Sequence, residues 1–180
     1  MKLSNMDDGF KKDQPSVIEE SASRNIMDVL EDFGITYTDI EDTAMELYVP
    51  HPGIETEEKA RLVFRREFDY AIHDSNLQLL VYAAFLLEKD GKEGKLPGLS
   101  KKSFEQDLSF IIADEVLGGA VAEYIAGTKG HFEFVRFDKK KPGILKHLGM
   151  FADDIIGGLI GGVSANMYSR AMFENEEENK

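Results

Sequence analysis

The sequence of 180 residues contains no cysteine and no tryptophan, and it has only five prolines and four histidines. Without cysteine the chain can form no disulfide, and it offers no thiolate nucleophile and no zinc–thiolate site. The absence of cysteine also fits a reducing compartment, so we expect a cytoplasmic protein.

Long hydrophobic runs are absent too. A membrane-spanning helix needs about 18 or more consecutive apolar residues. The best candidate, residues 155–167, is shorter and directly follows Asp153 and Asp154. The polar stretch 1–14 lacks the apolar segment of a signal peptide. The sequence therefore predicts no stable insertion in a membrane.

Basic residues are scarce relative to acidic ones. The chain has 21 Lys and Arg against 34 Asp and Glu, which gives a net charge of −13. Such a chain repels polyanions, so we expect no nucleic acid among its partners. The charge is uneven, because residues 16–130 carry −12 whereas residues 131–147 carry +3. The hydrophobic content of 42% and the twelve phenylalanines predict a folded chain.

Apolar residues recur every three or four positions through most of the chain, and this spacing predicts an all-α fold. Ser16, Thr38 and Ser103 are candidate N-caps. The expected helices cover residues 16–33, 38–47, 55–74, 77–89, 103–126 and 151–173. Residues 131–149 are expected to be irregular, with a short extended piece around the alternating phenylalanines of residues 132–137.

The chain is long enough for one domain with a sizeable core. We expect this domain at residues 16–173, with a flexible leader at residues 1–15 and a disordered tail at residues 174–180, which contain four Glu.

Glycines repeat at intervals of four in the last expected helix, at Gly157, Gly158, Gly161 and Gly162. A glycine costs about 1 kcal/mol in a helix interior, and close approach of another helix is the simplest compensation. We therefore expect a compact multi-helical bundle with a glycine-rich central C-terminal helix. Its apolar faces can be buried within one chain or across a homodimer.

Two acidic pairs, Asp114–Glu115 and Asp153–Asp154, are embedded in strongly apolar helical sequence. Because adjacent helix residues point about 100° apart, at least one carboxylate of each pair should face the apolar side. A buried carboxylate is costly unless it is paired or metal-bound, and oxygen ligands favour Mg²⁺, with Mn²⁺ as the alternative. On pattern alone, a joint metal site and two half-exposed pairs with basic partners are equally supported.

A basic segment, residues 136–143, lies between the two acidic pairs. Arg136 and Lys141 can neutralise a phosphate, and Asp138 can add a carboxylate. The alternative is a solvated loop. His51 lies in a loop between two prolines, where it is either a substrate contact or a surface histidine.

Three ordered segments resemble the phosphatidylglycerophosphatase A superfamily. They read ADEVLG at 113–118, FVRFDKKKPGIL at 134–145 and FADDIIGG at 151–158. The resemblance implies a Mg²⁺-dependent phosphomonoesterase. It implies metal ligands at Asp114, Glu115, Asp153 and Asp154. It also implies catalytic roles for Asp138, Lys141 and Asp153. Together with the residue patterns above, it leads us to expect that Arg136, Lys141 and His51 contact the substrate.

The chain is most similar to the soluble branch of this superfamily, the archaeal CobZ-type α-ribazole-5′-phosphate phosphatases of cobalamin biosynthesis. The stretch TAMELYVPHPG at 43–53 and the end of the basic segment carry this similarity. It implies a small phosphorylated substrate. One alternative is a phosphatase of phosphatidyl- or archaetidylglycerophosphate. The non-enzymatic alternative is an acidic helical module that binds a basic partner, with its acidic pairs exposed to solvent.

Overall fold

The computed structural model describes residues 24–106 and 110–178, and these residues form the expected all-α bundle. No β-strand occurs in them, and an isolated bridge joins His51 to Ile54. The elements are α1 (Ile26–Asp32), α2 (Tyr37–Met45), α3 (Glu57–Ile72), α4 (Ser75–Glu93), α5 (Lys101–Glu105), α6 (Ala113–Lys140), the 3₁₀ helix η1 (Gly143–His147) and α7 (Met150–Glu178). Within those two described stretches, no helix combines the length and apolar character needed to cross a membrane.

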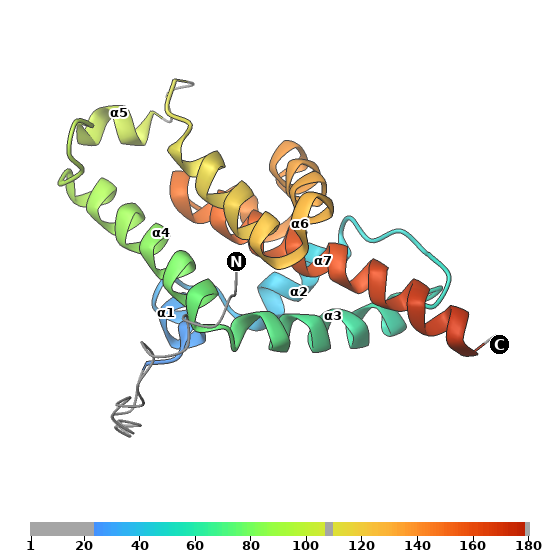
Figure 1. Ribbon diagram of the computed structural model, residues 1–180. Coiled ribbons are helices and arrows are strands. Elements are labelled where there is room, and N and C mark those ends of the chain that lie inside the picture. The colour runs from blue at the N-terminus through green and yellow to red at the C-terminus, as the bar shows by residue number, and fades with distance from the viewer. Residues whose placement is uncertain (1–23, 107–109, 179–180) are drawn as a thin grey trace, which may run out of the picture.

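Helix α7 runs through the middle of the bundle, with α6 on one side and α3 on the other (Figure 1). Its isoleucines Ile155, Ile156 and Ile160 are fully buried. A Cβ atom on Gly158 would overlap the carbonyl oxygen of Gly118 in α6. The prediction of a glycine-rich central C-terminal helix is therefore confirmed, and its glycines allow the close backbone contact with α6.

Helix α6 is a hairpin of two helical halves. The backbone leaves helical geometry at Ala126 and Gly127, where Gly127 has φ 61° and ψ −151°, a region that essentially only glycine adopts. The second half then runs back along the first, so that a Cβ on Gly130 would overlap the carbonyl oxygen of Ala122. Figure 1 shows the two halves side by side against α7.

The prediction of irregular or extended structure at residues 131–140 is wrong, because these residues form the second half of α6. Phe134 and Phe137, three positions apart, share the buried face, whereas Phe132 is exposed. The alternating phenylalanines thus belong to a helical pattern. Beyond Lys140 the chain leaves α-helical geometry and forms the short 3₁₀ helix η1 before α7 begins.

The expected helix at residues 103–126 is divided. Ser100 caps the short α5, in which Phe104 packs against Gly91 of α4 and stacks on Phe151 of α7. Helix α6 begins separately at Ala113. The buried Phe104 therefore packs α5 against α4 and α7. Phe104 thus belongs to a separate short helix and not to the start of α6.

The expected N-terminal boundaries also shift. Asn25 caps α1, while Ser16 and the expected leader lie outside the described residues. Thr36 caps α2 with Asp39 in the reciprocal position, so the prediction of Thr38 as the cap is wrong. Helix α7 continues beyond residue 173 to Glu178, and Glu174 forms an ion pair with Arg66 of α3 at 2.9 Å. Residues 174–178 are therefore helical, not a disordered tail.

Candidate metal and phosphate site

The α6 hairpin brings its first and last turns together, and α7 begins beside them. Asp114 and Glu115 lie in the first turn of α6, Asp138 and Lys141 lie at its end, and Asp153 and Asp154 lie in the first turns of α7. Contact between α6 and α7 holds this arrangement, since a Cβ on Gly118 would overlap the carbonyl oxygen of Asp154. The six positions that the sequence predicted therefore gather at one end of the α6–α7 pair.

Three carboxylates form a cluster that can hold a metal ion. One oxygen from each of Asp114, Glu115 and Asp154 lies within 4.8 Å of the other two. Asp114 and Asp154 are each only 3% exposed, and Oδ1 of each has no hydrogen-bond partner among the described residues. Buried carboxylate oxygens that accept no hydrogen bond are costly, even with the Lys141 ammonium 3.5 Å from Asp154 Oδ1, and a divalent cation that prefers oxygen ligands can coordinate both. The residues present therefore fit Mg²⁺ or Mn²⁺.

Burial governs the titration of both buried carboxyls in the metal-free chain. Burial, reinforced by Glu115, raises the pKa of Asp114 to about 8. Burial and the charge of Asp153 raise the pKa of Asp154 to about 7. In the metal-free chain these carboxyls therefore hold their protons to higher pH than an exposed aspartate does, and a bound cation would displace those protons.

Lys141 lies among the carboxylates of the site and carries the positive charge opposite them. Its Nζ donates to the carboxylate of Asp153 and lies 3.2 Å from Asp138 Oδ1 and 3.5 Å from Asp154 Oδ1. Burial lowers the pKa of Lys141, but the hydrogen bond to Asp153 and the surrounding charges raise it above its usual value. Lys141 is therefore protonated, and its ammonium group can neutralise a phosphate. Asp153 pairs with this lysine and lies outside the three-carboxylate cluster.

The backbone at Lys141 is unusual as well. With φ 44° it is, among the described residues, the only non-glycine with positive φ. Its amide closes α6 by donating to the carbonyl of Phe137 at 2.7 Å. A non-glycine residue in this region is strained, and such strain concentrates at functional sites. The turn that follows α6 thus begins at Lys141 itself.

Thr43 of α2 holds this turn and was missed in the sequence. Its hydroxyl accepts a hydrogen bond from the Ile144 amide at 3.0 Å and donates one to the Asp39 carbonyl at 2.6 Å. A Cβ on Gly143 would overlap this hydroxyl, so the glycine is required for the contact. No local pattern could have identified Thr43, because its partner lies about 100 residues away and the contact exists only after folding.

Glu88 of α4 is a second residue that sequence reasoning missed. It is 0% exposed, and its carboxylate accepts a hydrogen bond from the Phe151 amide at 3.1 Å. The available signal was an acidic residue in a helix that is apolar nearly all round. Glu88 therefore contacts the start of the helix that carries Asp153 and Asp154.

Arg136 and His51 do not join the carboxylates. They line a separate cavity of about 460 Å³ whose lining includes Tyr168 but none of the five acidic residues of the site or Lys141. Arg136 donates to the Leu47 carbonyl at 3.0 Å and to Glu133 at 2.6 Å. It precedes Asp138 by two positions, which is about 200° around a helix. The structure therefore places the two expected substrate contacts on a different face.

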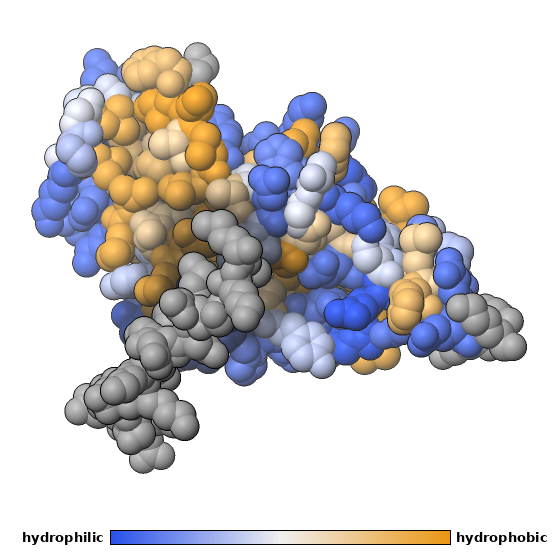
Figure 2. Space-filling model, viewed as in Figure 1, coloured by the Kyte–Doolittle hydropathy of each residue, from blue (hydrophilic) through white to orange (hydrophobic). Residues whose placement is uncertain are grey.

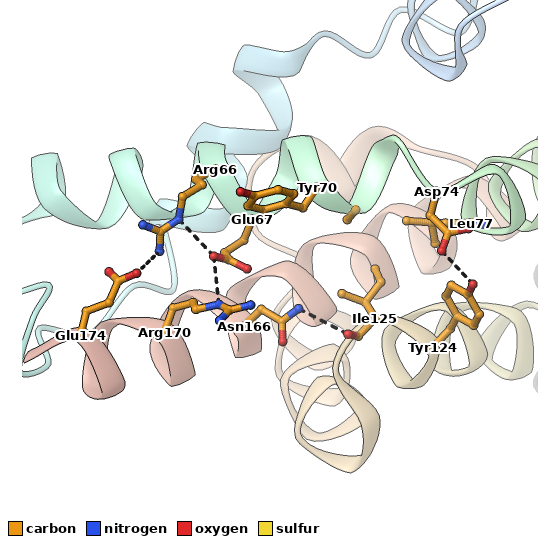
Figure 3. A pocket seen from close by; sticks show the side chains of 11 residues that line it. Arg66, Glu67, Tyr70, Asp74, Leu77, Tyr124, Ile125, Asn166, Arg170 and Glu174 are labelled. Atoms are coloured by element: carbon orange, nitrogen blue, oxygen red, sulfur yellow. Dashed lines mark hydrogen bonds and ion pairs between the residues drawn. The ribbon is translucent and has the colours of Figure 1, made fainter. Parts of the chain in front are cut away.

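Another cavity, of about 470 Å³, lies between α3, the α6 turn and the C-terminal half of α7 (Figure 3). Glu67, which is 4% exposed, lies between Arg66 at 3.2 Å and Arg170 at 3.6 Å, and Arg66 also contacts Glu174. None of the predicted site residues lines this cavity. Its ion pairs link α3 to α7.

Apolar side chains gather on the surface over α4, α5 and the start of α6 (Figure 2). Phe110, Ile112 and Val116, which flank Asp114 and Glu115 in the sequence, are exposed, and Phe110 is 73% exposed. On α4, Leu79 and Leu86 are exposed too. The carboxylate cluster therefore has an apolar border.

The chain matches a known protein family over most of its length. Residues 49–169 match the family described as phosphatidylglycerophosphatase A, and this range contains every position of the carboxylate and lysine site. An uncharacterized protein of Methanocaldococcus jannaschii is 33% identical over 131 residues, which cover 71% of this chain and 98% of that protein.

Solved structures share the fold. A protein of unknown function from Bacillus stearothermophilus superposes with a TM-score of 0.68 at 23% identity, covering 81% of this chain and 96% of that one. The low temperature requirement C protein of Listeria monocytogenes has a TM-score of 0.69 at 22% identity, covering 81% and 93%. The ypjQ protein of Bacillus subtilis has a TM-score of 0.68 at 18% identity, covering 86% and 94%. These similarities concern the architecture.

Proposed function

The chain belongs to the phosphatidylglycerophosphatase A family, and from this premise we propose that it is a Mg²⁺-dependent phosphomonoesterase acting on a small phosphorylated substrate. The substrate that we favour is α-ribazole 5′-phosphate, with α-ribazole and inorganic phosphate as products. Mn²⁺ is the alternative metal, because it accepts the same oxygen ligands.

One observation carries the proposal. Asp114 Oδ1 and Asp154 Oδ1 are buried and accept no hydrogen bond from the described residues, although the Lys141 ammonium lies 3.5 Å from Asp154 Oδ1. An oxygen of Glu115 lies within 4.8 Å of an oxygen of each residue. The acidic interaction module would have both pairs exposed to solvent, whereas Asp114 and Asp154 are buried. The geometry therefore favours the metal-dependent enzyme over the interaction module.

Asp114, Glu115 and Asp154 would hold the metal. When bound, the metal supplies a Lewis acid that polarises phosphoryl oxygens and lowers the pKa of water. Around it, the ammonium group of Lys141 neutralises the phosphate, and Asp153 holds that ammonium in place. We assign the role of base to Asp138, which is partly exposed and lies 3.2 Å from Lys141.

The reaction is a hydrolysis at phosphorus. The oxygen of a water molecule forms a bond to phosphorus, Asp138 accepts the proton of that water, and the bond between phosphorus and the ester oxygen breaks. The departing ester oxygen takes up a proton from solvent, Asp138 releases its proton to solvent, and the products are the alcohol and inorganic phosphate. The residues of the chain thus supply positioning, charge neutralisation and proton transfer.

The choice of α-ribazole 5′-phosphate is supported by the similarity of residues 43–53 to the CobZ-type phosphatases. The contact between Thr43 and Ile144 connects this stretch to the turn that presents Lys141. The net charge of −13 opposes approach to an anionic bilayer, which disfavours a substrate embedded in one.

A lipid phosphate is the second candidate, and a specific observation favours it. The exposed Phe110, Ile112 and Val116 border the carboxylate cluster and can contact acyl chains. The family description names a lipid phosphatase activity. This candidate requires the apolar border to outweigh the acidic charge of the chain.

A side-by-side assay tests the proposal. Phosphate release is measured from α-ribazole 5′-phosphate and from detergent-dispersed phosphatidylglycerophosphate, each with Mg²⁺ or with EDTA. We expect Mg²⁺-dependent release that is faster from the nucleotide. Faster release from the lipid would favour the second candidate, and no release from either would contradict both.

Two lysine variants provide a matched control for the same assay. We expect Lys141→Met to reduce turnover about 100-fold or more, as removal of a group that stabilises developing charge does. Lys139→Met removes an exposed lysine two positions away and should leave turnover nearly unchanged. Equal activity of the two variants would contradict the role of Lys141.

A further inference from the structure

The start of α7 depends on a hydrogen bond from another helix. The first amides of a helix have no acceptor within it and need one from outside. Gly149, which precedes α7, has no side chain that could serve. The carboxylate of Glu88 on α4 accepts the Phe151 amide hydrogen at 3.1 Å and so provides one acceptor.

The surroundings of Glu88 are built to hold its carboxylate at this place. Glu88 is 0% exposed, and the ammonium group of Lys92, one turn later in α4, lies 2.9 Å from its Oε1. A Cβ on residue 149 would overlap Oε1, so Gly149 leaves the room that the carboxylate fills. A negative charge at a helix N-terminus is favourable as well.

We propose that Glu88 is a positioning residue for the metal site, an inference that rests on the proposed function. The Phe151 amide precedes Asp154 by one turn of α7, so the hydrogen bond to Glu88 fixes where that turn begins. Asp154 must meet Asp114 and Glu115, which belong to another helix. Metal affinity is sensitive to small displacements of ligands, and Glu88 limits this displacement without touching the metal.

Glu67 provides a matched control for general stability. It is also a buried carboxylate, at 4% exposure, and it links α3 to α7 through Arg66 and Arg170. Its partner on α7, Arg170, lies far along that helix from Asp154. Loss of Glu67 should therefore lower stability without changing the geometry at the start of α7.

The experiment uses the full chain and compares Glu88→Gln, Glu88→Met and Glu67→Met. Gln retains a carbonyl acceptor for the Phe151 amide, whereas Met fills the space without one. The readouts are Mn²⁺ affinity by titration calorimetry, and the hydrogen-exchange rate of the Phe151 amide in EDTA, which needs no metal.

We expect Glu88→Met to weaken Mn²⁺ binding about 10- to 100-fold, as loss of a group that orients ligands typically does. It should also speed exchange of the Phe151 amide about tenfold or more. Glu88→Gln and Glu67→Met should stay within about threefold of wild type in Mn²⁺ affinity, because the hydrogen bond to Phe151 is kept in both.

Unchanged Mn²⁺ affinity in Glu88→Met would overturn the proposal, and so would an equal loss in Glu67→Met. If Glu88→Met does not unfold cooperatively, Gly149→Ala replaces it. The added methyl group displaces the Glu88 carboxylate from the Phe151 amide, while the charges of Glu88 and Lys92 are both retained. A wild-type chain that binds no Mn²⁺ would contradict the metal site of the proposed function. The exchange rates of Phe151 would then decide whether Glu88 holds α7.

Discussion

Asp114 and Asp154 are carboxylates in an environment that opposes their charge. Both are buried, and each has one oxygen without a hydrogen-bond partner among the described residues. Burial raises the pKa to about 8 for Asp114 and to about 7 for Asp154. In the unfolded chain such carboxyls have a pKa of about 4. At pH values between the unfolded pKa and the raised folded pKa values, the metal-free folded chain therefore binds more protons than the unfolded chain.

This difference predicts how the stability of the metal-free chain depends on pH. Because the folded pKa values are raised, the stabilising contribution is complete below about pH 4 and is lost as the pH rises to about 8. We expect the free energy of unfolding in EDTA to fall between pH 5.5 and pH 8.5. Asp114→Asn, which cannot ionise, should show a smaller fall. Urea unfolding at both pH values checks this, and equal falls in the two proteins would contradict it.

Lys141 combines a strained backbone with a charged side chain. Its φ of 44° lies in the region that glycine adopts without penalty. The side chain compensates by contacting three carboxylates. A glycine here would relieve the backbone but remove the ammonium group.

Two substitutions separate these contributions. Lys141→Gly and Lys141→Ala both remove the ammonium group, but only Gly removes the backbone strain. We expect Lys141→Gly to be more stable than Lys141→Ala by about 1 kcal/mol, with both inactive. Urea unfolding measures the difference, and an equal or greater stability of the alanine variant would show that φ at this position is not strained.

The individual site residues differ in how readily they can be identified from the sequence alone. Asp114 and Asp154 could be identified because an acidic residue in apolar helical sequence conflicts with burial. Glu88 carries the same conflict, but it stands alone, without the paired acidic pattern. Thr43 and Arg136 could not be placed, because their contacts join segments about 90 to 100 residues apart.

Helix α6 shows how much of a helix can be predicted from the spacing of its apolar residues alone. The end of the expected helix at residue 126 is confirmed, because the next residue, Gly127, adopts a conformation that requires glycine. The following residues were expected to be irregular, since their phenylalanines alternate. The buried surface of α7 selects the helical alternative, in which Phe134 and Phe137 face inward. Tertiary packing therefore decided the conformation of this half.

Two adjacent glycines of α7 test whether close helix contact explains the glycine pattern. A Cβ on Gly158 would overlap the Gly118 carbonyl oxygen, whereas a Cβ on Gly157 would lie 3.6 Å from Phe134, an ordinary contact. We expect Gly157→Ala to stabilise by up to about 1 kcal/mol through helix propensity. Gly158→Ala should destabilise by about 1–3 kcal/mol through overpacking. Thermal unfolding of both variants checks this, and equal effects would contradict the packing argument.

For the whole molecule, the net charge of −13 has two different sources. Many acidic residues of the described stretches are exposed on the surface, and some of them form ion pairs, as Glu55 does with Lys59. Asp114 and Asp154 are buried instead, next to the segment at residues 131–147 that carries +3. The all-α class and the gathering of acidic and basic motifs could be predicted from the sequence. The hairpin that unites them could not.

The central claim is that the carboxylate cluster holds the metal on which phosphatase activity depends. Phosphate release from a panel of phosphomonoesters tests it most directly, with wild type and the double variant Asp114→Asn/Asp154→Asn measured in Mg²⁺ and in EDTA. The account predicts release by wild type in Mg²⁺ alone, and a loss of orders of magnitude in the variant, whose circular dichroism spectrum should match that of wild type. Wild-type turnover in the double variant, or equal turnover in EDTA, would contradict it.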